Sequence, residues 1–180
     1  SQHKKMNFEL GLIRNHYVGR TFIEPTQNIR SLGVKLKLSS TKSIVKNKSI
    51  ILIDDSLVRG TTSSKIVKML YEAGAREVHV RIACPEIKFP DFYGVDMPTK
   101  EELLAHKMNN KEMCEHIKAK SLKFLSLDGL YRALGVEKRN NVYPQFSDHY
   151  FTGDYPIKPT DNLNELKVKQ LSLLSGKSSN

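Results

Sequence analysis

The stretch ILIDDSLVRGTTSS, residues 51 to 64, gathers side chains that could do chemistry at close spacing. An apolar run ends in two carboxylates, Asp54 and Asp55, and a loop of small and hydroxyl-bearing residues follows. Such a loop in front of a helix offers backbone amides and the positive end of the helix dipole to a phosphate group. The two negative charges beside it would repel a phosphate, so they require an explanation of their own.

A ligand with a sugar next to its phosphate explains both halves of the stretch. Asp54 and Asp55 could accept hydrogen bonds from vicinal hydroxyls, or hold Mg²⁺ directly or through water. The loop residues expected to hold the terminal phosphate are Ser56, Arg59, Gly60, Thr61, Thr62 and Ser63. A Walker loop does not fit, because no Lys follows a second Gly. The pattern therefore predicts a site for a ribose 5-phosphate with a metal ion at the carboxylates.

The sequence around this site predicts a strand, a helix and a second strand. Residues 49–54 are apolar on both faces, which predicts a central parallel strand covered by helices above and below. Apolar residues then recur at helical spacing, with N-cap candidates in residues 61–64 and Gly74 as the C-cap. Residues 77–84 alternate as a second strand. Together they predict a right-handed βαβ unit.

The rest of the chain extends an α/β pattern. Residues 8–13 and 33–40 are strand candidates, and a Pro-rich loop over 85–98 should lie where open α/β sheets bind ligands. Thr99 and Glu102 are spaced as a capping box, which predicts a helix start. The other predicted elements are a helix at about 110–118, a strand near 122–127 and a helix near 128–135. We place one domain at residues 1–137 and an extension at 138–180, whose last residues we expect to be disordered.

Composition limits the classes of function. The chain has 29 Lys and Arg against 19 Asp and Glu, and its first fifty residues hold ten basic and two acidic side chains. This excess suits a nucleic-acid arm, an acidic membrane surface, a polyanionic small ligand or a solvated basic face. No aromatic RNA-binding motif accompanies it, which disfavours nucleic acid. There is no run as apolar as a membrane span, no signal-peptide core, and no metal spacing at Cys84 or Cys114, so we expect a soluble cytoplasmic protein with reduced thiols.

The segment IILIDDSLVRGTTSS resembles the phosphoribosylpyrophosphate (PRPP) signature of type I phosphoribosyltransferases. The segments GLIRNHYVGRTFIEPTQ, YEAGAREVHVRIACPEIKFPDFYGVDMPT and FTGDYP extend the resemblance over most of residues 8–157 to the glutamine PRPP amidotransferases, which commit PRPP to purine synthesis. The resemblance is to their C-terminal phosphoribosyltransferase portion. It implies a type I phosphoribosyltransferase-like (Rossmann-like), mostly parallel sheet flanked by helices and incomplete at the N-terminus.

The same resemblance implies roles for residues. Asp54 and Asp55 would serve Mg²⁺ and the ribose hydroxyls, and Ser56 with residues 59–63 would hold the 5-phosphate. Arg14, Tyr17 and Arg20 would act in catalysis, from a mobile loop that closes over PRPP and neutralises the departing pyrophosphate. The reaction implied is displacement of pyrophosphate by ammonia to give 5-phosphoribosylamine.

The sequence also departs from the family. The glutaminase domain with its N-terminal cysteine is not found in this chain, so we expect ammonia to be free or to come from a separate glutaminase. The family's Asp-Ser-Gly stretch and one strand would lie upstream of Ser1, which predicts an exposed sheet edge and a homo-oligomer. Asp91 and Tyr150 stand where some relatives carry iron–sulfur cysteines, so no such cluster is expected.

Two other interpretations stay open. The chain could be a non-catalytic truncated remnant that still binds PRPP or a nucleotide. It could also be a phospho-accepting receiver domain with Asp96 as acceptor, which is disfavoured because Asp96 follows a Pro-rich loop and not an apolar strand. Three histidines lack metal-ligand spacing and receive no role: His106, His116 and His149.

Overall fold

A three-stranded parallel sheet forms the centre of the molecule, as the computed structural model shows for the residues it describes, which are 8–10, 12–14, 38–40, 42–95 and 99–157. Its strands are β3 (Ser49–Asp54), β4 (Glu77–Ile82) and β5 (Ser121–Phe124), in the order β3-β4-β5. A separate antiparallel pair joins β1 (Leu12–Arg14) to β2 (Leu38–Ser40). The predicted α/β class is confirmed.

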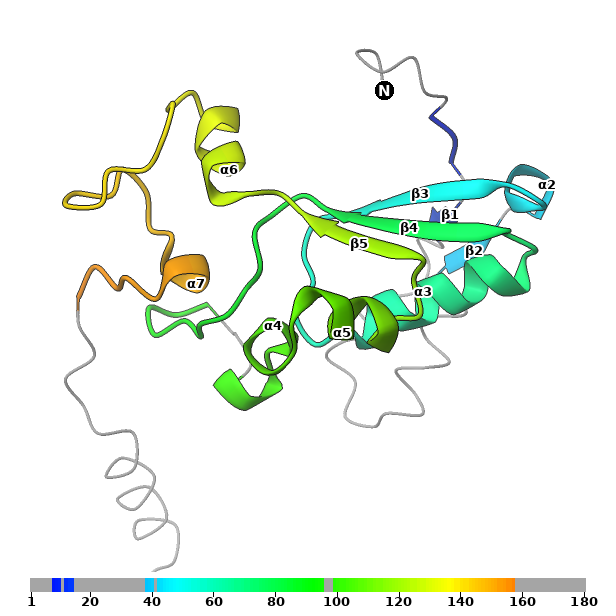
Figure 1. Ribbon diagram of the computed structural model, residues 1–180, viewed down its shortest axis with the longest axis horizontal. Helices are drawn as coiled ribbons and strands as arrows, with labels where there is room; N and C mark the ends of the chain where they lie inside the picture. Colours follow the sequence, from blue (N-terminus) through cyan, green and yellow to red (C-terminus); the bar gives the residue numbers. More distant parts are fainter. Residues whose placement is uncertain (1–7, 11, 15–37, 41, 96–98, 158–180) are drawn as a thin grey trace, which may run out of the picture.

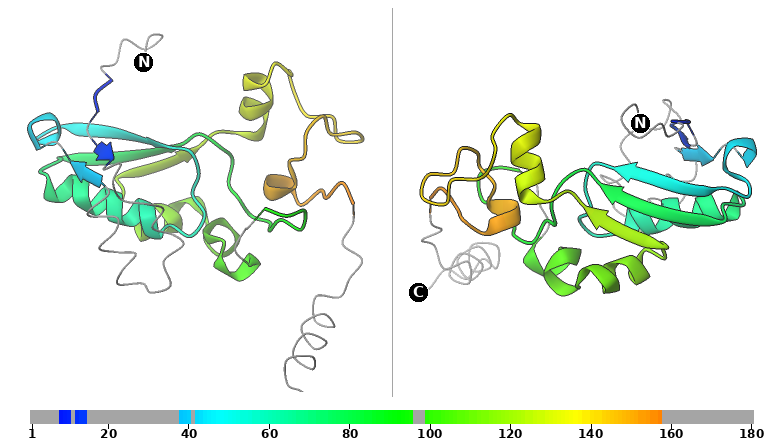
Figure 2. Two further views of the ribbon diagram at one scale, coloured as in Figure 1. Left: turned by 180° about the vertical axis from the view of Figure 1, so that it is seen from behind. Right: turned by 45° about the horizontal axis from the view of Figure 1, so that its top comes forward.

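The helices next to this sheet lie on one of its faces. Figures 1 and 2 show α3 (Thr61–Glu72), α4 (Leu104–Lys107) and α5 (Asn110–His116) on the same side of the strands. Alternation along β4 explains this, because every second residue is buried. The core between sheet and helices includes Ile66, Val67, Leu70, Val78, Val80, Ile82, Met113, Ile117 and Leu122.

The position of β3 corrects one prediction. Its bounds match the expected 49–54, but it lies at the edge of the three-stranded sheet and is not covered on both faces. Ile51 is 43% exposed and Ile53 is 68% exposed. An apolar run indicates that a strand can be buried on both faces. In the described part of the chain, helices cover only one face of β3.

Several element ends also differ from the sequence-based expectations. The first strand covers residues 12–14 and not 8–13, and residues 33–37 of the second lie outside the described part. The N-cap of α3 is Gly60, with no side-chain cap hydrogen bond, in place of a hydroxyl from residues 61–64. The helix closes at Ala73, and Gly74 follows with φ +95°. The capping box of Thr99 and Glu102 is present, but it opens a three-residue 3₁₀ helix, η3 (Lys100–Glu102).

Residues 139–155 fold back onto the loop that follows β4. They include α7 (His149–Thr152), and α6 (Leu127–Ala133) precedes them in the chain. The remaining short helix, α2 (Lys42–Val45), lies far from this region, just before β3. The amides of Lys88 and Phe89 donate to the carbonyl of Tyr150 at 2.9 and 3.1 Å. The expected disorder at the end of the chain concerns residues 158–180, which lie outside the described part.

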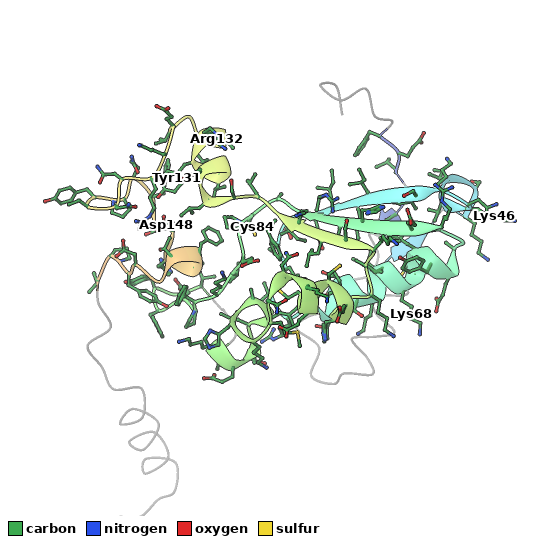
Figure 3. The ribbon with its side chains drawn as sticks, in the orientation of Figure 1. Lys46, Lys68, Cys84, Tyr131, Arg132 and Asp148 are labelled. Atoms are coloured by element: carbon green, nitrogen blue, oxygen red, sulfur yellow. The ribbon has the colours of Figure 1, made fainter. Side chains whose placement is uncertain are left out.

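A buried ion-pair network holds this region together. Arg139 donates to both carboxylate oxygens of Asp148, at 2.6 and 3.2 Å, and to Asp154 at 2.6 Å. The hydroxyl of Tyr131 donates to Asp148 at 2.8 Å, and Figure 3 shows these two side chains next to each other between α6 and α7. The segment that looks irregular in sequence is thus ordered by side-chain hydrogen bonds as far as residue 157.

Candidate functional site

The predicted PRPP-binding residues lie at the connection between β3 and α3. Asp54 is the last residue of β3 and Thr61 is the first of α3, so residues 55–60 make the whole connection at the carboxyl end of the sheet. Leu57, only 2% exposed, anchors the turn in the core. Open α/β sheets bind their ligands at this end of the strands.

Gly60 fits its place for two physical reasons. Its φ of +75° lies in the left-handed region, where a residue with a Cβ is strained. A Cβ on Gly60 would also come within 2.8 Å of Leu104 Cδ2 and 3.3 Å of His116 Cδ2. The turn can therefore pass close to α4 and α5 only with glycine at this position.

The N-terminus of α3 is available to an anion. No side chain of the described residues caps it, and its first turn contains no acidic residue. Thr61 and Thr62 are exposed, while Ser63 is buried at 4% exposure and faces the core side of the helix. The first amides of a helix have no partner within the helix itself, so these amides and the two exposed hydroxyls are donors that an anion could accept hydrogen bonds from.

The two carboxylates differ in environment. Asp54 is half-buried, and burial is the main reason why its pKa is raised; the neighbouring charge of Asp55 raises it further. The amide of Asp55 donates to Asp54 Oδ1 at 3.1 Å, and this hydrogen bond lowers the pKa in part. Asp55 is exposed and accepts a hydrogen bond from Ser56 Oγ at 3.0 Å. These like charges destabilise each other in the absence of a cation.

This donor set fits Mg²⁺. The ion prefers oxygen ligands and is typically held by one or two carboxylates with substrate phosphates and water completing its shell. In the described residues there is no group of three or more His, Cys, Asp and Glu side chains that could hold a metal ion alone. Asp54 and Asp55 would therefore share the ion with the ligand, and the ion would relieve their repulsion.

Cys84 lies just beyond β4, near the same edge of the sheet (Figure 3). Burial and the carboxylates of Asp55 and Asp54 raise the pKa of its thiol to about 11. Its Sγ donates to the carbonyl of Pro85 at 3.3 Å. Cys84 is thus a protonated thiol at neutral pH and not a nucleophile.

Arg59 makes an ion pair that the sequence did not reveal. Its Nε and Nη2 donate to Glu102 Oε1 and Oε2 at 3.3 and 3.2 Å. Next to it, the amide of Leu104 donates to the carbonyl of Val58 at 2.8 Å. The loop is thereby attached to η3 and α4, although Glu102 follows Arg59 by 43 residues.

A second cluster that sequence reasoning missed surrounds His149. This side chain is buried, and its Nε2 lies 2.9 Å from Asp91 Oδ1, while its buried Nδ1 has no hydrogen-bond partner among the described residues. Burial would raise the pKa of Asp91, but hydrogen bonds from the amides of Val95 and Tyr93 and from His149 outweigh it and lower that pKa. A separation of 58 residues gave no local signal for this pair.

The predicted catalytic residues are placed less completely. Arg14 is the last residue of β1, opposite Leu38 of β2. Tyr17 and Arg20 lie outside the described residues, as does Asp96 of the receiver-domain interpretation. The predicted PRPP-binding residues, by contrast, all lie between the last residue of β3 and the first turn of α3.

Comparison with known proteins decides the family. No family model matches the chain. The amidophosphoribosyltransferase of Rhizobium etli is 57% identical over 176 residues, which cover 97% of this chain and 36% of the relative. The chain corresponds to the phosphoribosyltransferase portion of the amidophosphoribosyltransferases. It spans about a third of the length of that curated relative, whose matched share is 36%.

Solved structures agree with this assignment to the amidophosphoribosyltransferases. Glutamine PRPP amidotransferase from B. subtilis, complexed with ADP and GMP, matches with a TM-score of 0.76 at 45% identity over 90% of this chain and 36% of that one. A structure described as the allosteric regulatory enzyme of purine biosynthesis matches with a TM-score of 0.69 at 45% identity, over 90% of this chain and 35% of that one. The predicted resemblance and fold are confirmed. Within the described residues, no helix combines the length and apolar character that crossing a membrane requires.

Proposed function

We propose that this chain binds PRPP with Mg²⁺ and, as part of an amidophosphoribosyltransferase, transfers the phosphoribosyl group to ammonia to give 5-phosphoribosylamine for purine synthesis. The observation that carries the proposal is the N-terminus of α3, which has no side-chain cap among the described residues and is separated from two adjacent carboxylates by residues 56–60 alone. The homologous relatives are enzymes of this name, and one was solved with two nucleotides, which supports a ligand that carries ribose and phosphate.

The loop would recognise the 5-phosphate. The first amides of α3 and the hydroxyls of Thr61 and Thr62 donate to phosphate oxygens, and such bonds to an ionised acceptor are stronger than neutral ones. The absence of acidic residues in the first turn of α3 keeps this end attractive to a dianion.

The carboxylates would recognise the sugar and the metal ion. Asp54 and Asp55 accept hydrogen bonds from the ribose hydroxyls and hold Mg²⁺. Bound Mg²⁺ supplies stabilisation of the negative charge that develops on the leaving pyrophosphate.

The basic segment near the N-terminus would complete the site. Arg14, Tyr17 and Arg20 would lie over bound PRPP, where the arginines stabilise pyrophosphate and a closed segment excludes water that would hydrolyse the substrate. Ammonia would be free or delivered by a separate glutaminase. A homo-oligomeric state and a cytoplasmic location belong to the same proposal.

The test is an assay of pyrophosphate release from PRPP and Mg²⁺ with either ammonium or glutamine as the nitrogen donor. We expect release with ammonium and none with glutamine. If the chain binds PRPP but releases no pyrophosphate with ammonium, the transferase part of the proposal fails and the chain is a binding remnant.

A further inference from the structure

We propose that Glu102 is a positioning residue for the phosphate loop. In this proposal, which rests on the proposed function, Glu102 orients Arg59 and so holds residues 55–60 in the shape that presents the first amides of α3 to the 5-phosphate. Arg59 then acts on the loop and does not touch the phosphate.

The geometry of the ion pair supports this role. Two different nitrogens of Arg59 donate to the two different oxygens of Glu102, at 3.3 and 3.2 Å. A paired arrangement of this kind fixes the plane of the guanidinium as well as its position. Arg59 precedes the N-cap of α3 by one residue, so its orientation is transmitted directly to Gly60.

Glu102 is itself held in place. Its Oε2 accepts the amide of Thr99 at 3.3 Å, which is one half of the capping box of η3. The hydrogen bond from Arg59, more than any other contact, lowers the pKa of Glu102, so the carboxylate is charged at neutral pH. The acceptor for Arg59 is therefore fixed by the backbone of its own helix.

Two further contacts act on the neighbouring loop residues. The amide of Leu104 donates to the carbonyl of Val58 at 2.8 Å. The side chain of Leu104 is buried, at 5% exposure. Its Cδ2 would lie 2.8 Å from a Cβ added to Gly60. Glu102 and Leu104 thus hydrogen-bond to Arg59 and Val58, and Leu104 also lies beside Gly60, immediately before α3.

The pair should affect the loop more than the stability of the fold. Both side chains are about half exposed, at 50% and 49%, and exposed ion pairs contribute little to global stability. Substitutions at either position should therefore fold, which allows binding to be compared directly.

A double-mutant cycle separates positioning from direct contact. The proteins are the unmodified chain, Arg59→Gln, Glu102→Gln and the double variant, with PRPP and Mg²⁺ affinity measured by calorimetry. Glu112→Gln is the matched control, because Glu112 completes the capping box of α5 in the same way but does not contact Arg59.

If Glu102 positions Arg59, each single variant should bind PRPP about tenfold more weakly, which is the scale seen when outer partners of binding groups are removed. The double variant should lose no more than either single variant. Urea midpoints and the Glu112→Gln affinity should stay unchanged. If Glu102→Gln binds PRPP as tightly as the unmodified chain, or more tightly, while Arg59→Gln binds weakly, Arg59 contacts the phosphate directly and the inference is overturned.

Hydrogen exchange without ligand keeps this test separate from that of the proposed function. We expect the amides of residues 57–63 to exchange faster in Arg59→Gln and in Glu102→Gln than in the unmodified chain or the control. A chain that fails to bind PRPP but shows this faster exchange contradicts the proposed function and supports the loop attachment. Unchanged exchange in both variants overturns the attachment.

Discussion

Gly60 is the residue on which the shape of the loop of residues 55–60 depends most strongly. It combines a φ of +75° with the close approach of Leu104, whereas Gly135 has a φ of +83°, and no atom of the described residues lies within 4 Å of a Cβ built on it. The two glycines therefore separate backbone strain from steric overlap.

We expect Gly60→Ala to lower the free energy of unfolding by about 2 kcal/mol and to abolish PRPP binding, because strain and overlap act together. Gly135→Ala, which carries only the strain, should lose about 1 kcal/mol and keep its affinity. Urea denaturation and calorimetry measure both effects. Equal losses of stability in the two variants, with PRPP affinity retained, would contradict this view of the loop.

At the scale of elements, the network of Arg139, Asp148 and Tyr131 fixes α6 and α7 relative to each other. Burial would raise the pKa of Asp148, but the hydrogen bonds from Arg139 and Tyr131 hold it below its ordinary value. Since the folded state favours the carboxylate, Asp148 contributes stability at pH values above about 4, its unfolded pKa. This contribution is lost as the pH falls from about 4 through the lower pKa of the folded state.

We expect Asp148→Asn to cost about 3 kcal/mol at pH 7, because it leaves Arg139 buried without its main partner. The cost relative to the unmodified chain should shrink as the pH falls below about 4, because the unfolded carboxylate then binds a proton, and it should disappear once the pH is below the lower pKa of the folded state. Urea midpoints between pH 7 and pH 2.5 measure the difference. A cost that stays constant over this range would show that the charge of Asp148 is not what stabilises the network.

The exposed face of β3 leads to a second prediction about the elements of the fold. Ile53 is 68% exposed and Val80 is fully buried between sheet and helices. We expect Ile53→Thr to change the free energy of unfolding by less than about 0.5 kcal/mol, and Val80→Ala to lower it by about 2 kcal/mol. Denaturant unfolding compares the two. A loss at Ile53 as large as that at Val80 would mean that this face is covered in solution.

At the scale of the whole molecule, the site was predictable where its signal is local. The bounds of β3 and the turn that carries Asp54, Asp55 and Gly60 follow from an apolar run, an acidic pair and small residues within fourteen positions. The pair of Arg59 and Glu102 spans 43 residues and that of Asp91 and His149 spans 58, so no local periodicity could reveal them. The edge position of β3 was also hidden, because hydrophobicity does not identify the element that covers a strand.

The molecule as a whole matches about a third of a curated amidophosphoribosyltransferase, 36% of its length, so the proposed function first requires that this portion binds PRPP. Calorimetric titration of the full chain with PRPP, with and without Mg²⁺, measures this binding. The control is the double variant Asp54→Asn with Asp55→Asn, which keeps the shape of both side chains and removes their charge. We expect Mg²⁺-dependent binding that the double variant loses. Binding that is indifferent to Mg²⁺ and to both substitutions, or no binding by the folded chain, would mean that Asp54 and Asp55 do not form a metal and ribose site.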